Sequence, residues 1–352
     1  MSQPGFFDIA QRYEKLQEMG DPLEAMNKII PWEAFRPTLE KALREETRKS
    51  EAGRKPYDEV LMFKVLVLQS LYGLSDKETE YQLRDRLSFT RFLGLELEDG
   101  VPDEKTIWNY RDRLAKKKTD KQLFEVFHKY LGQKGYKAQR GQIVDATLVE
   151  VPVQRNKREE NEQIKAGETP EEWKEQPEKL RQKDVDARWL QKNGEDYYGY
   201  KSHVNVDHRY KLIRKYEVTT ASVHDSQKMK ELLDKKNPDK RVWGDSAYRS
   251  EKTEKMLKKM GYKSRIHYKG TRENELTARE WLSNKSRSKV RARVEHVFGH
   301  QVQALGGKFS RLIGMVRNRW KIGMMNLIYN LSRYKWLFMT GKPKQYRALM
   351  GV

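Results

Sequence analysis

The sequence of 352 residues contains no cysteine. This absence excludes disulfide bridges, thiolate catalysis and zinc sites built on cysteine, and it agrees with a reducing cytoplasm. No apolar run reaches the roughly 20 residues of a membrane-spanning helix. The first residues, MSQPGFFDIAQRYEK, lack the basic and then apolar regions of a secretory signal. We therefore predict a cytoplasmic protein that does not act at a membrane.

Acidic residues are too few to balance the basic ones, so the formal net charge is +21. The excess is uneven, because residues 1–200 sum to −2 and residues 201–352 sum to +23. A concentrated positive charge is the footprint of a polyanionic partner. Nucleic acid is favoured over a membrane surface, because no amphipathic lipid-binding helix stands out.

Short helices dominate the predicted N-terminal domain, residues 1–138. The first 55 residues read as helical and end in a charged loop. An apolar helix then runs from Asp58 to a stop at Gly73, and a capping box opens a helix over residues 76–94. A third helix begins with Asp103 as its N-cap. This pattern predicts an all-α domain for DNA binding or oligomerisation.

Helices joined by tight glycine turns are compatible with a DNA-binding helix-turn-helix. An ordinary small helical bundle explains the same pattern equally well. Arg111 and Arg113, on the third helix, favour contact with DNA slightly.

The pattern changes near residue 139, where alternating β-branched residues begin. We predict a catalytic domain over residues 139–340, with a charged, exposed insertion at about 155–195 and a basic tail at 341–352. The elements of the domain alternate as strand, hairpin, helix, strand, helix, strand and helix. This order predicts an α/β fold with a mixed sheet.

Three acidic residues lie in apolar or small-residue segments of this domain. They are Asp145 in QIVDATLV, Asp245 in RVWGDSAY and Glu295 in VRARVEHVFG. The first two segments read as strands and the third as a helix. Buried carboxylates are costly unless they are paired or bound to a cation. Oxygen ligands suit Mg²⁺, and two such ions can cleave a phosphodiester. The three acids therefore predict a Mg²⁺ site that cuts nucleic acid.

Each of these acids alone is weak evidence. An Asp at a strand end is more often a turn or cap residue. Arg291 precedes Glu295 by one helical turn and could orient it or contact phosphate, but such a pair is more often a surface ion pair. The combination of two strand acids and one helix acid in a basic half-chain raises the odds of a catalytic site.

Histidines offer competing interpretations. His296 and His300 have the spacing of a zinc pair on one helix, but no third ligand is visible. His203 could approach phosphate, although a structural histidine is the more common case. We interpret His224 and Asp225 as a helix cap.

Six segments together carry a family resemblance. They are VDATLV, DVDARW, GYKSHVNVD, TTASVHDS, WGDSAY and RARVEHVFG. They resemble DDE transposases of bacterial insertion sequences, and the nearest group is the insertion-sequence-five family. The likeness runs from about residue 55 to 340. It implies an RNase H-like catalytic domain, with Asp145, Asp245 and Glu295 as catalytic triad and metal ligands.

A helix signature of related groups reads Tyr, two residues, Arg, three residues, Glu, six residues, Lys. Arg291 and Glu295 match it, whereas Ser288 stands in place of the Tyr and Val302 in place of the Lys. Lys308 lies close enough in the sequence to substitute for that Lys.

The resemblance implies a Mg²⁺-dependent DNA transposase of a prokaryotic cell, associated with the nucleoid when bound, with Mn²⁺ as a substitute ion. Such an enzyme binds the inverted terminal repeats of its element, hydrolyses the phosphodiester there and joins the 3′-OH to target DNA. Two ends must be held at once, which implies a homodimer or larger assembly on double-stranded DNA. A regulator or nuclease of the same ancestry is the alternative. The basic residues predicted to contact DNA are Arg111, Arg113, Lys201, Lys308, Arg311, Arg317, Arg319 and Lys321.

Overall fold

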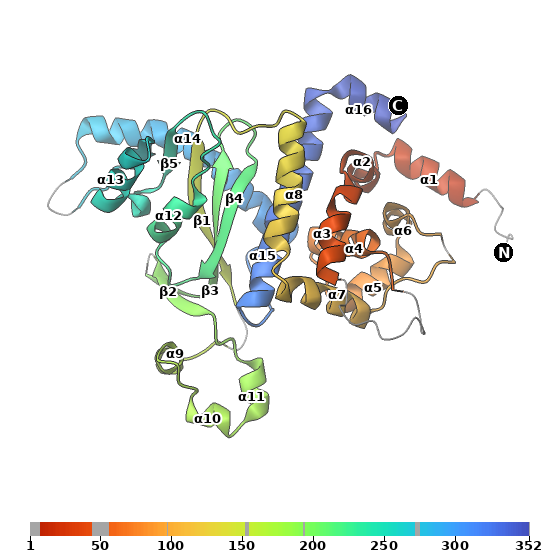
Figure 1. Cartoon of the computed structure of the whole chain (residues 1–352), viewed down its shortest axis with the longest axis horizontal. Coiled ribbons are helices and arrows are strands. Elements are labelled where there is room, and N and C mark those ends of the chain that lie inside the picture. Colours follow the sequence, from red (N-terminus) through yellow and green to blue (C-terminus); the bar gives the residue numbers. More distant parts are fainter. Residues whose placement is uncertain are drawn as a thin grey trace. The chain divides into compact units, whose positions relative to one another are not determined.

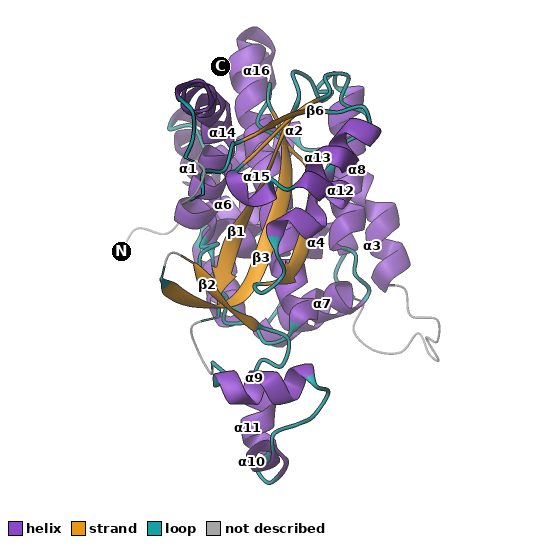
Figure 2. Ribbon diagram, turned by 90° about the vertical axis from the view of Figure 1, so that its left-hand side faces the viewer, coloured by secondary structure: helices purple, strands orange, loops and turns teal. Residues whose placement is uncertain are grey.

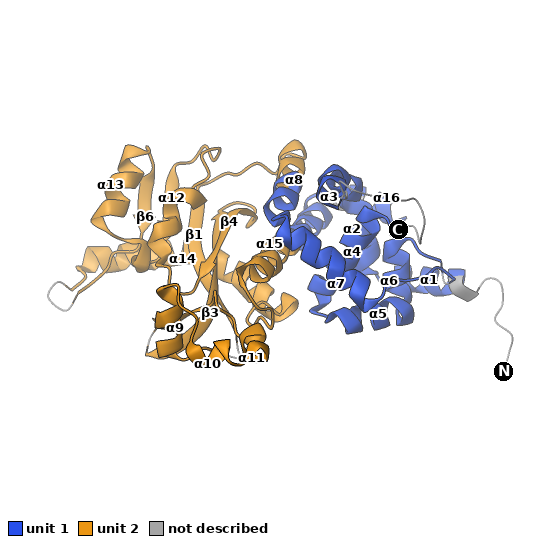
Figure 3. Ribbon diagram, turned by 60° about the horizontal axis from the view of Figure 1, so that its bottom comes forward, with its two compact units in different colours: residues 1–127, 330–352 blue, residues 128–329 orange. Residues whose placement is uncertain are grey.

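The protein divides into two compact units, which Figure 3 shows in different colours. The computed structural model describes residues 8–43, 56–96, 98–151, 155–192, 194–271 and 275–351. The first unit is Met1–Phe127 with Asn330–Val352, and the second is His128–Tyr329. The predicted limits at residues 139 and 341 stay predictions. Most of the predicted charged loop before residue 56 lies outside the described residues. None of the described helices combines the length and apolar character needed to cross a bilayer.

The first unit is helical, in agreement with the predicted all-α region. Two of its helices are shared with the second unit along the chain, α8 and α15. Its elements are α1 Asp8–Glu18, α2 Pro22–Ile29, η1 Trp32–Phe35, α3 Arg36–Leu43, α4 Glu59–Tyr72, α5 Asp76–Asp85, α6 Leu87–Leu93, α7 Glu104–Lys116, α8 Asp120–Gln133, α15 Met315–Gly341 and α16 Pro343–Met350.

Helix α4 begins and ends where its sequence predicts. The Asp58 carboxylate accepts hydrogen bonds from the backbone N–H groups of Val60 and Leu61, both at 2.9 Å. Gly73 ends the helix in the left-handed conformation at φ 65°, which glycine adopts without steric cost. The predicted caps of the next helices are also present, at Ser75 before α5 and at Asp103 before α7.

The single helix predicted over residues 76–94 is in fact two, α5 and α6. Arg86 between them takes an extended conformation, with φ −99° and ψ 112°. Its guanidinium lies over the rings of Tyr72 and Phe89, at 5.0 and 4.5 Å from their centroids. The break turns Phe89 and Phe92 into the core, so tertiary packing overrides the helical sequence pattern here.

The second unit is built on a six-stranded mixed sheet (Figures 1 and 2). The strand order is β2-β3-β1-β5-β6, and β4 also pairs with β3. Pairs β1–β3, β2–β3 and β3–β4 are antiparallel, whereas β1–β5 and β5–β6 are parallel. The predicted α/β class is confirmed, and the fold is RNase H-like. The strands are β1 Gln142–Glu150, β2 Arg188–Lys192, β3 Glu195–Asp207, β4 Ile213–Thr220, β5 Arg241–Gly244 and β6 Lys263–Ile266.

Helices cover the sheet and supply its core. A buried apolar cluster joins β1 and β5 to α12 Met229–Leu232 and α13 Glu251–Lys259 through Val144, Leu232 and Leu257, among others. The short helix η2, Asp225–Lys228, directly precedes α12. The long helix α14, Ala278–Leu305, packs against β1 and β5.

The helix that follows the predicted cap at His224 and Asp225 is short. It consists of η2 and α12 and ends at Leu232. The Leu232 carbonyl accepts a hydrogen bond from Asn205 at 2.8 Å, and the Asp234 N–H donates to Gln142 at 2.8 Å. Because buried polar groups on β1 and β3 need these partners, the backbone leaves the helix to supply them.

The charged insertion between β1 and β2 folds into three short helices. They are α9 Arg158–Lys165, α10 Glu171–Lys174 and α11 Pro177–Gln182, and Figure 1 shows them projecting from the end of the sheet. Trp173 is fully buried, and its indole N–H donates to Glu160 at 3.1 Å. One tryptophan therefore gives this acidic segment a small core of its own.

Gly199 on β3 provides the first test of this fold. Its φ is +153°, and an added Cβ would lie 2.3 Å from the Val149 carbonyl oxygen of β1. We expect Gly199→Ala to lower the free energy of unfolding by at least about 2 kcal/mol. Gly261→Ala is the matched control, because φ is +76° there but nothing lies within 4 Å, so its cost should be about 1 kcal/mol. Urea denaturation of both variants compares them, and equal costs would show that β1 and β3 are not so closely apposed.

Candidate active site

Asp145 and Asp245 lie side by side on neighbouring strands. In the parallel pair β1–β5, Ile143 is opposite Trp243. Each aspartate comes two residues later on its strand, Asp145 within β1 and Asp245 directly after the last residue of β5. The register therefore brings together the two strand acids that the sequence singles out, although they are 100 positions apart.

Asp145 is held in a buried ion pair. One of its carboxylate oxygens, Oδ2, accepts a hydrogen bond from Nη2 of Arg291 on α14 at 2.9 Å. The two side chains are 10% and 19% exposed. The other oxygen, Oδ1, accepts the backbone N–H of Ala146 at 2.9 Å. Arg291 thus binds the first strand acid rather than serving only its helical neighbour Glu295.

Asp245 sits at the point where β5 turns into the short helix η3, Ser246–Tyr248. Its carboxylate caps that helix by accepting the Ala247 N–H at 2.9 Å. The cap fixes the side chain just beyond the end of β5, beside the strand β1 that carries Asp145. A cap role and a role in the site are therefore combined in one residue.

Glu295 is placed differently from the two aspartates. It lies one turn after Arg291 on α14, and its side chain is exposed. The structure describes no group of three Asp, Glu, His or Cys side chains close enough to hold a metal ion. The third acid lies on a helix, as predicted for its segment, but among the described residues it does not form a metal-binding group with the two aspartates.

Opposing electrostatic effects act on the ionisable groups of the site. Burial raises the pKa of the Asp145 carboxyl, Arg291 opposes that rise, and the negative charge of Asp245 adds to it. Burial lowers the pKa of Arg291, but the three acids Asp145, Asp245 and Glu295 together raise it above its ordinary value. A buried carboxylate next to another one requires a nearby cation to stay ionised. Arg291 supplies that charge.

The donor chemistry of the aspartate pair fits a hard divalent cation. Two carboxylates on adjacent strands offer oxygen ligands, which Mg²⁺ and Mn²⁺ prefer. Mg²⁺ also uses few protein ligands and keeps several waters. Asp145 and Asp245 would hold such an ion, and a bound ion would supply Lewis-acid activation at a phosphodiester.

A third aspartate, predicted from the sequence only as part of a helix cap, lies in the same region of the fold. Asp225, the first residue of η2, forms an ion pair with Nζ of Lys201 at 2.9 Å. His203 Nδ1 is 4.0 Å from the same carboxylate. Burial lowers the pKa of His203 to about 4, so the ring is neutral at pH 7. Asp225 stands out in the segment TTASVHDS, but its ion pair with Lys201 could not be predicted without the position of β3 in the fold.

The charges of all three aspartates, Asp145, Asp225 and Asp245, act on the buried Tyr248. It is fully buried, and its hydroxyl has no hydrogen-bond partner among the described residues. Burial raises the pKa of Tyr248 well above its ordinary value, and the charges of Asp145, Asp225 and Asp245 add to the effect. The tyrosine therefore stays protonated beside three carboxylates.

Some of the predicted DNA contacts bond to other groups of the protein. Lys201 is 6% exposed, and its ammonium also donates to the Val223 carbonyl at 2.8 Å. Arg111 pairs with Asp76, and Arg113 donates to the Leu43 carbonyl. These three side chains tie elements of their own unit together, so we do not carry them into the proposed DNA surface.

Other predicted contacts lie closer to solvent. Lys308 and Arg311 are exposed, Arg317 is exposed and Arg319 half-buried. Burial lowers the pKa of Lys321 to about 8, and its Nζ donates to the Phe309 carbonyl at 2.5 Å. Lys308 and Arg311 are therefore the clearest members of a basic surface in the second unit.

The alternative histidine interpretations gain no support. His296 is exposed and His300 is half-buried against the Tyr329 ring, with centroids 5.5 Å apart, and the described residues contain no metal-holding group that includes them. His224 accepts the Ser226 N–H at 3.3 Å and so caps η2, as predicted.

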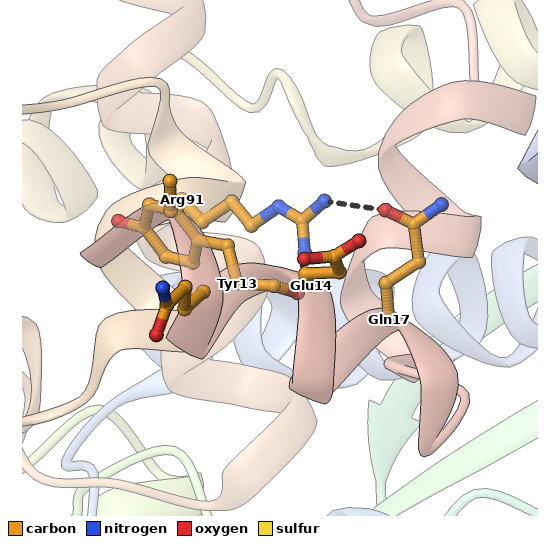
Figure 4. Close-up of a pocket in the computed structure, with 6 residues that line it drawn as sticks. Tyr13, Glu14, Gln17 and Arg91 are labelled. Carbon is orange, nitrogen blue, oxygen red and sulfur yellow. Dashed lines mark hydrogen bonds between the residues drawn. The ribbon is translucent and has the colours of Figure 1, made fainter. Parts of the chain in front are cut away.

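A shallow pocket in the first unit is unrelated to these acids (Figure 4). Tyr13, Glu14 and Gln17 of α1 and Arg91 of α6 line it, together with Ala10 and Gln11. Arg91 donates to the Gln17 side chain at 3.2 Å and pairs with Glu24 at 2.8 Å. Its charge is used in joining helices, and the pocket presents no group suited to strand cleavage.

The mixed sheet with its paired aspartates has an RNase H-like arrangement, and a helical unit is separate from it. Residues 136–331 match the model of the Transposase DDE domain family, more than half of the chain, and the protein belongs to that family. Residues 11–113 match the model described as Transposase domain (DUF772). The resemblance to insertion-sequence DDE transposases is thereby confirmed.

The chain is also similar to a solved structure, a piggyBac transposase synaptic complex with hairpin DNA. The identity is 13%, the TM-score is 0.43, and the match covers 95% of this chain and 79% of the other. That likeness is too weak to carry conclusions about the site.

The Lys201–Asp225 pair yields a second prediction. Lys201→Met leaves a carboxylate beside the aspartate pair without its cation, so we expect the free energy of unfolding to fall by roughly 2–4 kcal/mol. Lys201→Met with Asp225→Asn should recover part of that loss. Lys228→Met is the control, because its partner Glu231 is 49% exposed, and its cost should stay below about 1 kcal/mol. Chemical denaturation in EDTA measures these three variants and Asp225→Asn alone, and additive effects at Lys201 and Asp225 would disprove the coupling.

Proposed function

We propose that this transposase cleaves DNA at the ends of its own element with a divalent cation held at Asp145 and Asp245, with Glu295 as the third acid. The observation that supports this is the register of β1 and β5, two interior strands of the sheet, which brings the two carboxylates close together. Family membership supplies the reaction class, DNA transposition. The proposed steps are binding of inverted terminal repeats, hydrolysis to a 3′-OH and joining of that 3′-OH to target DNA.

Several features of the chain suit these steps. The carboxylates provide fixed negative charge on neighbouring strands, and α14 brings Arg291 to Asp145 and carries Glu295 one turn further along. The neutral Tyr248 adds no further negative charge beside the acids, and the neutral His203 adds no positive charge. Lys308 and Arg311 provide exposed cations for phosphate contact in the same unit. We propose that the protein acts as a dimer or larger assembly, because two element ends must be joined.

Isosteric variants test the catalytic assignment. We expect Asp145→Asn, Asp245→Asn and Glu295→Gln each to reduce cleavage of a terminal-repeat duplex by at least about 100-fold, because each removes a ligand charge at nearly unchanged size. Binding of the duplex should change little. Cleavage should require Mg²⁺ or Mn²⁺ and fail in EDTA, while Ca²⁺ should allow binding without cutting.

The measurement is nicking of a labelled duplex alongside a gel-shift assay. An acid whose variant cleaves at the wild-type rate does not belong to the site. Wild-type protein that binds the repeat specifically but never cuts it would instead identify a regulator of the same ancestry, and cutting of any duplex would identify a plain nuclease.

Salt dependence tests the basic surface. Charge reversal of Lys308 and Arg311 to Glu should weaken binding to specific and random duplexes alike, because phosphate contacts carry no sequence information. The slope of log affinity against log salt should flatten by about 0.9 for each phosphate that the variant no longer neutralises. The control reverses Lys174 and Arg181 to Glu, two exposed cations of the insertion that pair with Glu171 and Glu178. If both double variants change the slope equally, total charge rather than this surface governs binding.

A further inference from the structure

We infer that Arg291 is a placeholder cation, which occupies the Asp145 end of the metal site and must leave Asp145 when a divalent ion binds. The inference rests on the proposed function, because it takes Asp145 and Asp245 as the ligands. It adds a positioning residue whose bond opens and closes with the state of the site.

The first support is which atom Arg291 holds. Its Nη2 lies 2.9 Å from Oδ2 of Asp145, while Oδ1 of Asp145 is used by the Ala146 N–H. A divalent ion would need an oxygen of this carboxylate that faces Asp245. The guanidinium and the ion are both positively charged and would both bind the Asp145 carboxylate. Because like charges repel, the two cations compete for it.

The second support is the charge balance. Asp145, Asp245 and Glu295 all act on Arg291, which brings a single positive charge to three acids. One guanidinium neutralises the buried Asp145 but leaves the site negative overall. A divalent ion supplies twice that charge, so it satisfies the pair better than Arg291 does once the ion is available.

The third support is that Arg291 is lightly held. Its Nε is buried without a hydrogen-bond partner among the described residues, and its bond to Asp145 is the one that the structure shows for this side chain. Arg287 and Arg293 on the same helix instead donate to backbone carbonyls, those of Ile266 and His208. Opening one ion pair therefore releases Arg291, whereas its neighbours serve the packing of α14.

This arrangement also accounts for the position of Glu295. The acid is exposed one turn from Arg291 and is not gathered with the aspartates among the described residues. While Arg291 occupies Asp145, the charge of Asp145 is already balanced, and Glu295 lies one turn from Arg291 on the exposed side of α14. Displacement of Arg291 from Asp145 would remove a contact between α14 and β1, so ion binding would act directly on the helix that carries both Arg291 and Glu295.

The test measures ion affinity without DNA and without catalysis. Mn²⁺ is titrated into the full chain, and free Mn²⁺ is followed by electron paramagnetic resonance. Because Arg291→Gln removes the competing charge, we expect it to bind Mn²⁺ on the order of tenfold more tightly than the wild type. Arg293→Gln removes the same charge from the same helix without touching Asp145, and its affinity should change by less than about twofold.

Thermal unfolding supplies a second readout. In EDTA, Arg291→Gln should melt below the wild type, because Asp145 loses its counter-ion. Mn²⁺ should raise its melting temperature more than that of the wild type, since stabilisation grows with ion affinity. If Arg291→Gln does not fold, Arg291→Lys decides, because its compact, strongly hydrated charge cannot reproduce the planar fork, and its affinity should rise by about threefold.

Asp145→Asn separates the possible failures. If wild type and Asp145→Asn bind Mn²⁺ equally, the ion does not use Asp145, and the proposed catalytic site is wrong. If Asp145→Asn abolishes binding while Arg291→Gln, or Arg291→Lys where that variant decides, binds as the wild type does, the site stands and the placeholder is disproved.

Discussion

The pairing of β1 with β5 is the constraint on which the site depends. Parallel pairing sets residues of equal offset beside each other, so the register that opposes Ile143 to Trp243 also brings Asp145 next to Asp245. Two neighbouring carboxylates in a partly buried position are unfavourable in their ionised form unless a cation lies beside them. The surrounding elements answer that need, because α14 packs on the same two strands and contributes Arg291.

A second ion pair, which involves the neighbouring strand β3, also neutralises an acidic residue of this region. Lys201 on β3 neutralises Asp225, and Tyr248 lies within the influence of Asp145, Asp225 and Asp245. Each cation comes from an element other than that of its acid. The acids are therefore stable only when the sheet, η2, η3 and α14 are assembled, which couples the integrity of the site to the fold of the whole second unit.

Local signals in the sequence predict much of this fold. The caps of α4, α5 and α7 involve residues two or three positions from the groups they bind, and the β3–β4 hairpin joins neighbouring segments. The acids on β1, β5 and α14 stand out because charge is rare in such settings. The break at Arg86 and the burial of Lys201 escape prediction, because ring contacts and ion pairs decide them after packing.

The role of Arg291 shows most clearly why a motif does not fix a geometry. Sequence spacing places Arg291 one turn before Glu295, which suggests a pair within the helix. The folded chain offers a stronger partner, because Asp145 is buried and Glu295 is exposed. A charge in low dielectric interacts more strongly than the same charge in water, so the arginine turns to the residue 146 positions away. The carboxylate most in need of a cation determines the contact, and sequence proximity does not.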